Sequence, residues 1–247
     1  MIHIAAKAML GPILFAQAFR LRRSVIELPE ASGARSGVAG TGTVRLRLLI
    51  AGDSAAAGVG AATQDEALAG HLVRGLARRA GGAVRWQLVA RTGARSEDVF
   101  HLLKDRNLRK ADIGVVLAGV NDISKQVSLR RALRTRDEIA ALMQERAGVE
   151  HVVFSALPEM EKFPALPQPL AWYAGQHARH YNEAQARWLA GRDAVSHASM
   201  EGVMDPSLMA GDGFHPGPRL YAKVAQRLAV HIIEEVLPGL RKGKGAA

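Results

Sequence analysis

The chain has 247 residues, of which 48% are hydrophobic and 23% charged, a composition typical of one large globular domain and not of a disordered or fibrous protein. It contains no cysteine, which excludes disulfide bonds and thiolate metal sites, and we expect a cytoplasmic protein, with export and peripheral membrane association left open. The formal net charge is +10, but no nucleic-acid-binding motif accompanies it, so we expect a solvated basic surface and no nucleic-acid partner. The arginines expected on solvated helix faces are Arg74, Arg78, Arg79, Arg130, Arg131, Arg134 and Arg136.

The chain opens with an apolar segment, "AMLGPILFAQAF" at 8–19. This segment is shorter than the roughly 20 apolar residues that span a bilayer, and a Gly-Pro pair interrupts it. The basic run "RLRR" at 20–23 follows the apolar stretch instead of preceding it, which makes a poor signal peptide. We expect residues 1–23 to form a helix that packs on the rest of the protein, with peripheral contact to a membrane surface as the alternative.

Residues 24–44 are rich in glycine and serine and are expected to form a linker. The chain thus divides into an N-terminal helical arm with its linker (1–44) and one folded domain (45–247). Within the domain, apolar runs alternate with helical segments, which predicts an α/β fold whose parallel sheet is covered on both faces. A capping box of Thr63 and Glu66 marks the start of the first domain helix. The predicted elements, in chain order, are strands at 44–52, 83–90, 112–119, 151–157 and 194–199 and helices at 63–82, 96–106, 128–148, 170–190 and 218–237.

Small and polar residues follow the first three strands, where the carboxyl ends of a parallel sheet bind ligands. Ser54 follows the first strand, Gly93 the second and Asn121 the third, while Asp212 and His215 precede the last helix. A serine hydroxyl needs a base to become a nucleophile, and a histidine held by an aspartate supplies one. The N–H groups of Ser54 and Gly93 and the amide of Asn121 are the donors expected to hold an oxyanion.

The sequence blocks "GDSAAAG", the isolated Gly93, "GVND" and "DGFHP" resemble, in this order, the four blocks of the SGNH (GDSL-type) hydrolases. The resemblance covers residues 45–237, although Ala55 stands where the family's older name has leucine. It implies a flavodoxin-like three-layer α/β/α sandwich with a five-stranded parallel sheet and a serine esterase without metal or cofactor. In that comparison Ser54 is the nucleophile, Asp212 and His215 complete the triad, and Ser54, Gly93 and Asn121 form the oxyanion hole.

The loop at 158–173 follows the fourth strand and is expected to overhang the same edge. Its Phe163, Leu166, Trp172 and Tyr173 either line an acyl pocket or pack the loop against the domain. Taken singly, the other motifs also have structural explanations, since Gly-Asp-Ser can be a turn and Asn121 a helix cap. The "HARH" sequence at 177–180 is expected on a solvated helix face and not at a metal.

Together these motifs predict an enzyme that hydrolyses small or short-chain acyl esters through an acyl-enzyme intermediate. Two alternatives use the same site, namely a thioesterase or lysophospholipase and a carbohydrate O-acetyl esterase. A third alternative is a non-enzymatic module that binds an anionic surface through its basic residues. The length of the acyl chain and the oligomeric state do not follow from the sequence.

Overall fold

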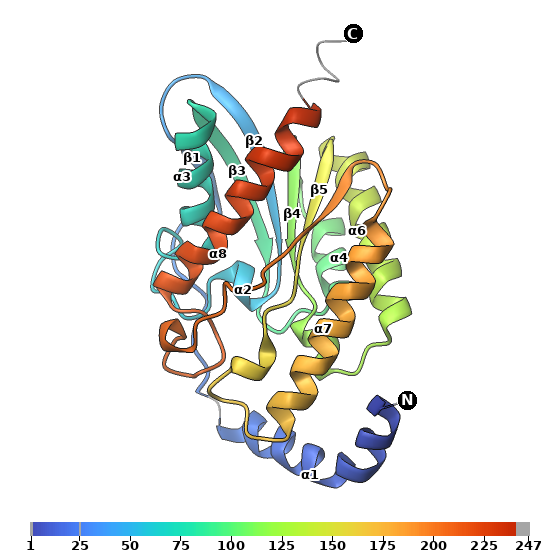
Figure 1. Ribbon diagram of the computed structural model, residues 1–247. Helices are drawn as coiled ribbons and strands as arrows, with labels where there is room; N and C mark the ends of the chain where they lie inside the picture. Colours follow the sequence, from blue (N-terminus) through green and yellow to red (C-terminus); the bar gives the residue numbers. More distant parts are fainter. Residues whose placement is uncertain (1, 25, 241–247) are drawn as a thin grey trace.

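A six-stranded sheet forms the middle layer of the molecule, in the strand order β1-β3-β2-β4-β5-β6 (Figure 1). The computed structural model describes residues 2–24 and 26–240. Strands β2 to β6 all run parallel, so the five parallel strands predicted from the sequence are confirmed. Their bounds are Val44–Gly52 (β2), Ala83–Ala90 (β3), Ile113–Leu117 (β4), His151–Ser155 (β5) and Val195–Ala198 (β6).

The sixth strand lies in the segment expected to be a linker. Strand β1 (Ser36–Ala39) pairs with β3 in the antiparallel direction and forms the edge of the sheet. Just upstream, Glu30 accepts hydrogen bonds from the N–H and the hydroxyl of Thr92 at 2.6 and 2.8 Å. The linker prediction is therefore wrong for residues 30–39, because a strand of four residues is too short to show an alternating pattern.

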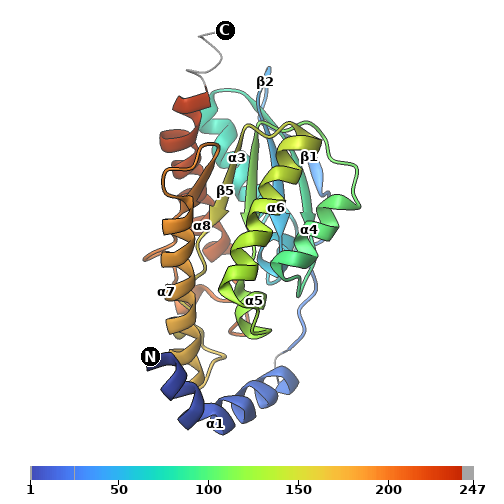
Figure 2. The ribbon, with the colours of Figure 1, turned by 90° about the vertical axis from the view of Figure 1, so that its right-hand side faces the viewer.

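Helices cover both faces of the sheet, which confirms the three-layer α/β/α prediction (Figure 2). Helices α3 and α8 pack together on one face, α4 and α6 pack together on the other, and α7 runs beside β6. The bounds are Ser54–Ala57 (α2), Leu68–Ala80 (α3), Ser96–Lys104 (α4), Val120–Ser124 (α5), Leu129–Ala147 (α6), Leu170–Leu189 (α7) and Pro218–His231 (α8), which continues as a π-helical turn over Ile232–Val236. Short 3₁₀ turns occupy Met160–Lys162 and Pro206–Leu208.

Helix α3 begins at Leu68 and not at Thr63, so the predicted capping box is wrong. Thr63 forms a parallel bridge with Ser32 instead, and the N–H of Glu66 bonds the Thr63 carbonyl in a turn. The buried side-chain amide of Gln64 donates to two backbone carbonyls at 3.1 and 3.0 Å. These contacts tie the segment before α3 to the residues preceding β1 and keep it out of the helix.

The central strand β2 is buried on both faces. Leu48 and Ile50 belong to the cluster under α3 and α8, whereas Leu49 and Ala51 belong to the cluster under α4 and α6. Successive side chains of a strand point to opposite faces, so burial on both sides requires a continuous apolar run. Strand β2 runs parallel to β3 and β4, and its carboxyl end lies at the lower edge of the sheet in Figure 1.

Helix α1 (Ile2–Ser24) lies across the lower end of α7 (Figures 1 and 2). The side chain of Leu14 is buried there. The amide of Gln17 donates to the Gln168 carbonyl at 2.6 Å and accepts from the Leu170 N–H at 3.1 Å. The N-terminal helix therefore packs on the domain, as expected. Within the described ranges, no helix is both long and apolar enough to cross a membrane.

Candidate active site

The turn after β2 fixes the position of Ser54, the first residue of α2. A Cβ atom at Gly52 would lie 2.1 Å from the Leu117 carbonyl oxygen on the neighbouring strand, so only glycine fits there. The carboxyl group of Asp53 caps α2 by accepting a hydrogen bond from the Ala55 N–H at 3.0 Å. The tight turn thus holds the Ser54 hydroxyl at the carboxyl edge of the sheet.

Ser54, His215 and Asp212 form one continuous chain of hydrogen bonds. The Nε2 atom of His215 lies 3.0 Å from the Ser54 Oγ, and its Nδ1 lies 2.5 Å from the Asp212 Oδ2. The other carboxylate oxygen of Asp212 accepts the N–H groups of Phe214 and His215, both at 3.0 Å. The structure therefore brings together the three side chains that the sequence predicts to meet.

The carboxylate of Asp212 is held in its charged form. Burial raises the pKa of Asp212, but the hydrogen bonds donated by His215 and Phe214 outweigh burial and leave that pKa below its ordinary value. An ionised carboxylate at Nδ1 keeps the proton on that nitrogen and directs the lone pair of Nε2 toward Ser54. This is the tautomer in which the imidazole can accept the hydroxyl proton.

The 211–217 loop, which carries this imidazole, and the start of α8 lie against the residues that follow α2. The hydroxyl of Tyr221 donates to the Val59 carbonyl at 2.7 Å. A Cβ atom at Gly60 would lie 2.4 Å from the Pro216 carbonyl oxygen, and the φ of Gly60 is +97°. Both the close approach and the backbone conformation therefore require glycine at this position. The separation between base and hydroxyl thus depends on contacts between the early and late parts of the chain.

Gly93 lies in the loop that follows β3, and Asn121 lies in the short helix α5 that follows β4; both strands neighbour β2. Gly93 is exposed and adopts a φ of +73°, in the left-handed region that favours glycine. The side-chain nitrogen of Asn121 donates to the Ala94 carbonyl at 3.1 Å. In the part of the chain that the structure describes, this is the one hydrogen bond of that nitrogen, so its second hydrogen is left for another acceptor.

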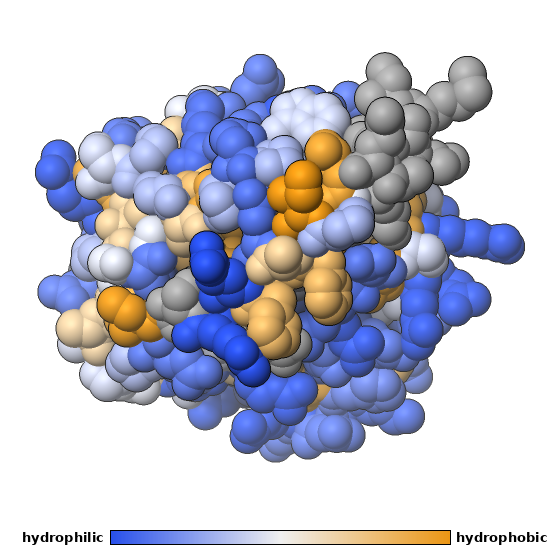
Figure 3. All heavy atoms as spheres, turned by 90° about the horizontal axis from the view of Figure 1, so that it is seen from below, coloured by the Kyte–Doolittle hydropathy of each residue, from blue (hydrophilic) through white to orange (hydrophobic). Residues whose placement is uncertain are grey.

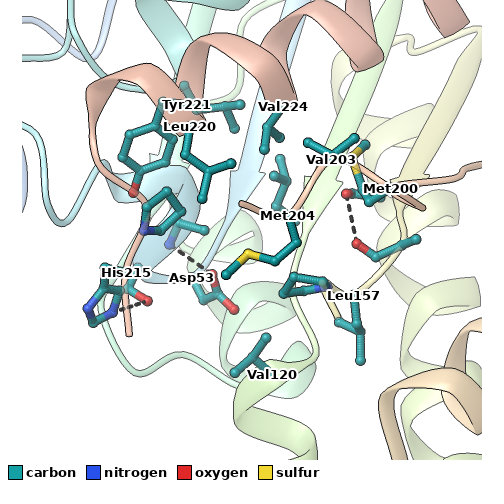
Figure 4. A pocket seen from close by; sticks show the side chains of 18 of the residues that line it. Asp53, Val120, Leu157, Met200, Val203, Met204, His215, Leu220, Tyr221 and Val224 are labelled. Carbon is teal, nitrogen blue, oxygen red and sulfur yellow. Dashed lines mark hydrogen bonds between the residues drawn. The ribbon is translucent and has the colours of Figure 1, made fainter. Parts of the chain in front are cut away.

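An apolar cavity of about 110 Å³ adjoins Ser54 and His215. Its lining comes mainly from the strand ends, α8 and the segment at 200–209, and the side chain of Met204 reaches into the middle of the group (Figure 4). The lining includes Leu157, Phe163, Met200, Met204, Leu220 and Val224. A hydrocarbon group bound there would extend from a carbonyl carbon beside the Ser54 hydroxyl.

Of the four residues expected to line an acyl pocket, Phe163 lines this cavity and the other three do not. Leu166 packs against the core at a partly buried position. Trp172 and Tyr173 lie in the first turn of α7, where the Tyr173 ring contacts His177 at 4.4 Å between centroids. The pocket prediction is corrected accordingly, because Leu166 packs against the core and Trp172 and Tyr173 belong to α7, outside the cavity lining.

A sequence profile of the GDSL-like lipase/acylhydrolase family matches residues 50–223, which is most of the chain. The chain belongs to this family. It is 28% identical to the GDSL-like esterase Rv1075c of Mycobacterium tuberculosis over 193 residues, which are 74% of this chain and 60% of that protein. The chain thus spans less than two thirds of that relative.

Solved structures share the fold of this GDSL-like family member. The lipase Lip_vut3 from a goat rumen metagenome superimposes with a TM-score of 0.62 at 16% identity, covering 74% of this chain and 95% of the other. A family 3 carbohydrate esterase of Clostridium thermocellum gives 0.59 at 16% identity, covering 79% and 98%. At such identities the similarity shows the fold alone.

A buried polar network in this GDSL-like protein lies behind Asn121. Asp122 accepts hydrogen bonds from the N–H and the hydroxyl of Ser96 at 3.0 and 2.5 Å. Arg136 donates to the Ser96 hydroxyl at 2.9 Å and to the Ala118 carbonyl at 2.6 Å, and its guanidinium lies 3.8 Å from Asp122. Arg136 is only 1% exposed, so its expected place on a solvated helix face is wrong. The network ties α4, α6 and the short helix α5, which carries Asn121, together.

The sequence did not predict the roles of Arg136 and Glu30. Glu30 accepts a hydrogen bond from the N–H of Thr92, the residue before Gly93. For Arg136, the available signal is its position one residue beyond Thr135 on the face of α6 that also buries Ala132 and Ile139. Glu30 has no comparable signal, because its segment lacks periodicity. In the described parts of the chain, no group of three or more His, Cys, Asp or Glu side chains is arranged to hold a metal ion.

Asp53 is the other titratable group of the site. Burial, and to a smaller extent the charge of Asp122, raise the pKa of Asp53 to about 7, against the opposing effect of the bond from the Ala55 N–H. Its side chain lines the cavity but makes no hydrogen bond to His215 in the described structure. Asp53 and Asp212 therefore differ in environment, and only Asp212 is oriented to assist the imidazole.

Proposed function

We propose that the protein is a serine-dependent carboxylic ester hydrolase that acts through an acyl-enzyme intermediate. The observation that carries the proposal is the hydrogen-bonded chain from Ser54 through His215 to Asp212, with its 3.0 and 2.5 Å separations, beside an apolar cavity. A solvated turn would not need a buried carboxylate behind the histidine. Membership of the GDSL-like lipase/acylhydrolase family and the esterase named among its relatives support the same chemistry.

In the first half of the reaction, the Ser54 Oγ attacks the ester carbonyl carbon while its proton passes to His215 Nε2. The tetrahedral intermediate then collapses, the bond to the alcohol oxygen breaks, and the same proton leaves with the alcohol. In the second half, water gives a proton to Nε2 and its oxygen attacks the acyl-serine. Release of the acid returns the proton to Ser54. Asp212 stays ionised throughout and stabilises the imidazolium.

The negative charge on the carbonyl oxygen is stabilised by three donors, the N–H groups of Ser54 and Gly93 and the amide of Asn121. The Asn121 amide is already oriented by its bond to the Ala94 carbonyl, so its direction need not change during the reaction. The network behind it, through Asp122 and Arg136, ties the short helix α5 to α4 and α6. Donors fixed before the reaction are worth more than donors that must reorient.

The cavity favours a short acyl group as substrate. An engineered protein cavity of about 150 Å³ holds benzene, so about 110 Å³ corresponds to roughly four carbon atoms. We therefore propose esters up to about the size of butyrate. A carbohydrate O-acetyl esterase is the second candidate function. A carbohydrate esterase shares the fold, and an acetyl group would also fit the cavity. Thioester and lysophospholipid cleavage would use the same residues.

Labelling with a fluorophosphonate probe, followed by peptide mapping, tests the proposal. The wild type should be modified at Ser54, and Ser54→Ala and His215→Ala should not be labelled. A panel of p-nitrophenyl acetate, butyrate and octanoate, with acyl-CoA and acetylated sugars alongside, then separates the candidate substrates. Absence of labelling and of hydrolysis, together with salt-dependent binding to an anionic surface that Ser54→Ala retains, would favour the binding module instead.

A further inference from the structure

The two faces of helix α1 differ in their surroundings. Leu14 and Gln17 face the domain, where Leu14 is buried and Gln17 bonds the residues at the start of α7. The opposite face carries Phe15, Phe19 and Arg23, one turn apart along the helix. Phe15 is 74% exposed and Phe19 is 49% exposed. We call Phe15, Phe19 and Arg23 the outer stripe.

The members of the outer stripe contact one another in order. The Phe15 and Phe19 rings stack with their centroids 6.4 Å apart, and the Arg23 guanidinium lies over the Phe19 ring at 4.2 Å. Arg20, exposed on the same helix, adds a second positive charge beside them. Two stacked aromatic rings in water expose apolar surface that a partner can bury, and the arginines limit which partner that can be.

Helix α1 lies at the end of the molecule to which the carboxyl ends of the strands point (Figures 1 and 2). Seen from that end, hydrophobic side chains lie next to strongly hydrophilic ones on the surface (Figure 3). The outer stripe and the edge of the sheet that carries Ser54 therefore lie toward the same end.

We propose that the outer stripe docks the protein on the surface of an anionic lipid bilayer. On such a surface, the exposed rings enter the acyl boundary and the guanidinium groups meet lipid phosphates. The net charge of +10 attracts the chain to such a surface and repels a second copy of itself. In this proposal α1 lies along the bilayer surface; none of the described helices is long and apolar enough to cross a membrane.

The test is co-sedimentation of the full chain with vesicles of phosphatidylcholine alone and with vesicles that also contain phosphatidylglycerol. The wild type should bind the anionic vesicles at least about tenfold more tightly. Arg20→Glu with Arg23→Glu should weaken that binding about 30-fold or more, at about a fivefold loss for each removed cation. Phe15→Ser with Phe19→Ser should weaken it at least about tenfold.

The matched control is Arg134→Glu with Arg187→Glu, which makes the same charge change at exposed positions on α6 and α7. It should bind nearly as the wild type does, and Ser54→Ala should bind identically, because docking does not use the nucleophile. All helix variants should keep wild-type turnover of a water-soluble p-nitrophenyl ester, which shows that the domain is folded.

Three results would overturn the proposal. The first is a wild type that binds neither kind of vesicle. The second is a loss of binding that is equal in the control and in Arg20→Glu with Arg23→Glu, which would mean that the net charge of the protein alone determines vesicle binding. The third is a dimer in light scattering that Phe15→Ser with Phe19→Ser abolishes, which would assign the outer stripe to a second copy of the chain.

Discussion

The Asp53→Asn substitution should stabilise the protein in alkaline solution, and the gain should grow with pH. The pKa of Asp53 is raised from 3.8 to about 7 in the folded protein, mainly by burial. A carboxylic acid whose pKa is higher in the folded than in the unfolded protein destabilises the folded state once it loses its proton. Its penalty is absent below the unfolded pKa of 3.8, grows through the range between the two values, and is complete above about 7. Asparagine keeps an oxygen to accept the Ala55 N–H but carries no charge.

The size of the effect follows from the two pKa values. Each pKa unit corresponds to about 1.4 kcal/mol, so the complete penalty is about 4 kcal/mol in the free energy of unfolding. Between about pH 5 and pH 9 the penalty grows by about 3 kcal/mol, because part of it is already present at the lower pH. For a chain of this length, that difference corresponds to a melting temperature change of about 6–12 °C.

Urea unfolding of the wild type and of Asp53→Asn, followed by tryptophan fluorescence at both pH values, measures this difference. Asp65→Asn, which removes a carboxylate with 90% side-chain exposure, is the matched control. Parallel pH profiles for the wild type and Asp53→Asn would show that the pKa of Asp53 does not change on folding, and the assignment of a raised pKa would be abandoned.

Asn121→Ala should lower kcat on p-nitrophenyl butyrate by about 10²–10³-fold, since it removes one oxyanion donor, and unchanged turnover would remove Asn121 from that role. Met204→Ala should enlarge the cavity and raise the octanoate-to-butyrate ratio of kcat/KM by at least about tenfold, and a constant ratio would mean that the acyl chain binds elsewhere. Arg136→Met leaves Asp122 buried without its cation and should lower the free energy of unfolding by about 3–5 kcal/mol. The exposed Arg134→Met on the same helix is its control, and equal losses in urea unfolding would contradict a special place for Arg136.

The sequence was most informative where burial imposes a pattern. The central strand was predicted at 44–52 and is found at Val44–Gly52, because burial on both faces requires an uninterrupted apolar run. The meeting of Ser54 with His215 was expected from the resemblance to the SGNH sequence blocks, while the strand-end rule accounts only for Ser54, which directly follows β2. Their 3.0 Å separation could not be predicted, because it depends on the loop contacts made by Gly60 and Tyr221.

The failures share a cause, which is that contacts between distant segments leave no local pattern. Arg136 shares the buried face of α6 with Ala132 and Ile139, but its partners Asp122 and Ser96 come from other segments and cannot be paired with it from the sequence. The edge strand β1 is too short to alternate visibly, and Thr63 pairs with Ser32 instead of capping a helix. The cavity is lined from α8 and the 200–209 segment, so a search confined to one loop found only Phe163.

The nucleophile and its base are separated by 161 residues of chain, and the loop that carries the base leads into α8, whose Tyr221 bonds the Val59 carbonyl. During synthesis, Ser54 therefore emerges from the ribosome long before the imidazole that would activate it. A polypeptide that ends before His215 would carry an inert alcohol.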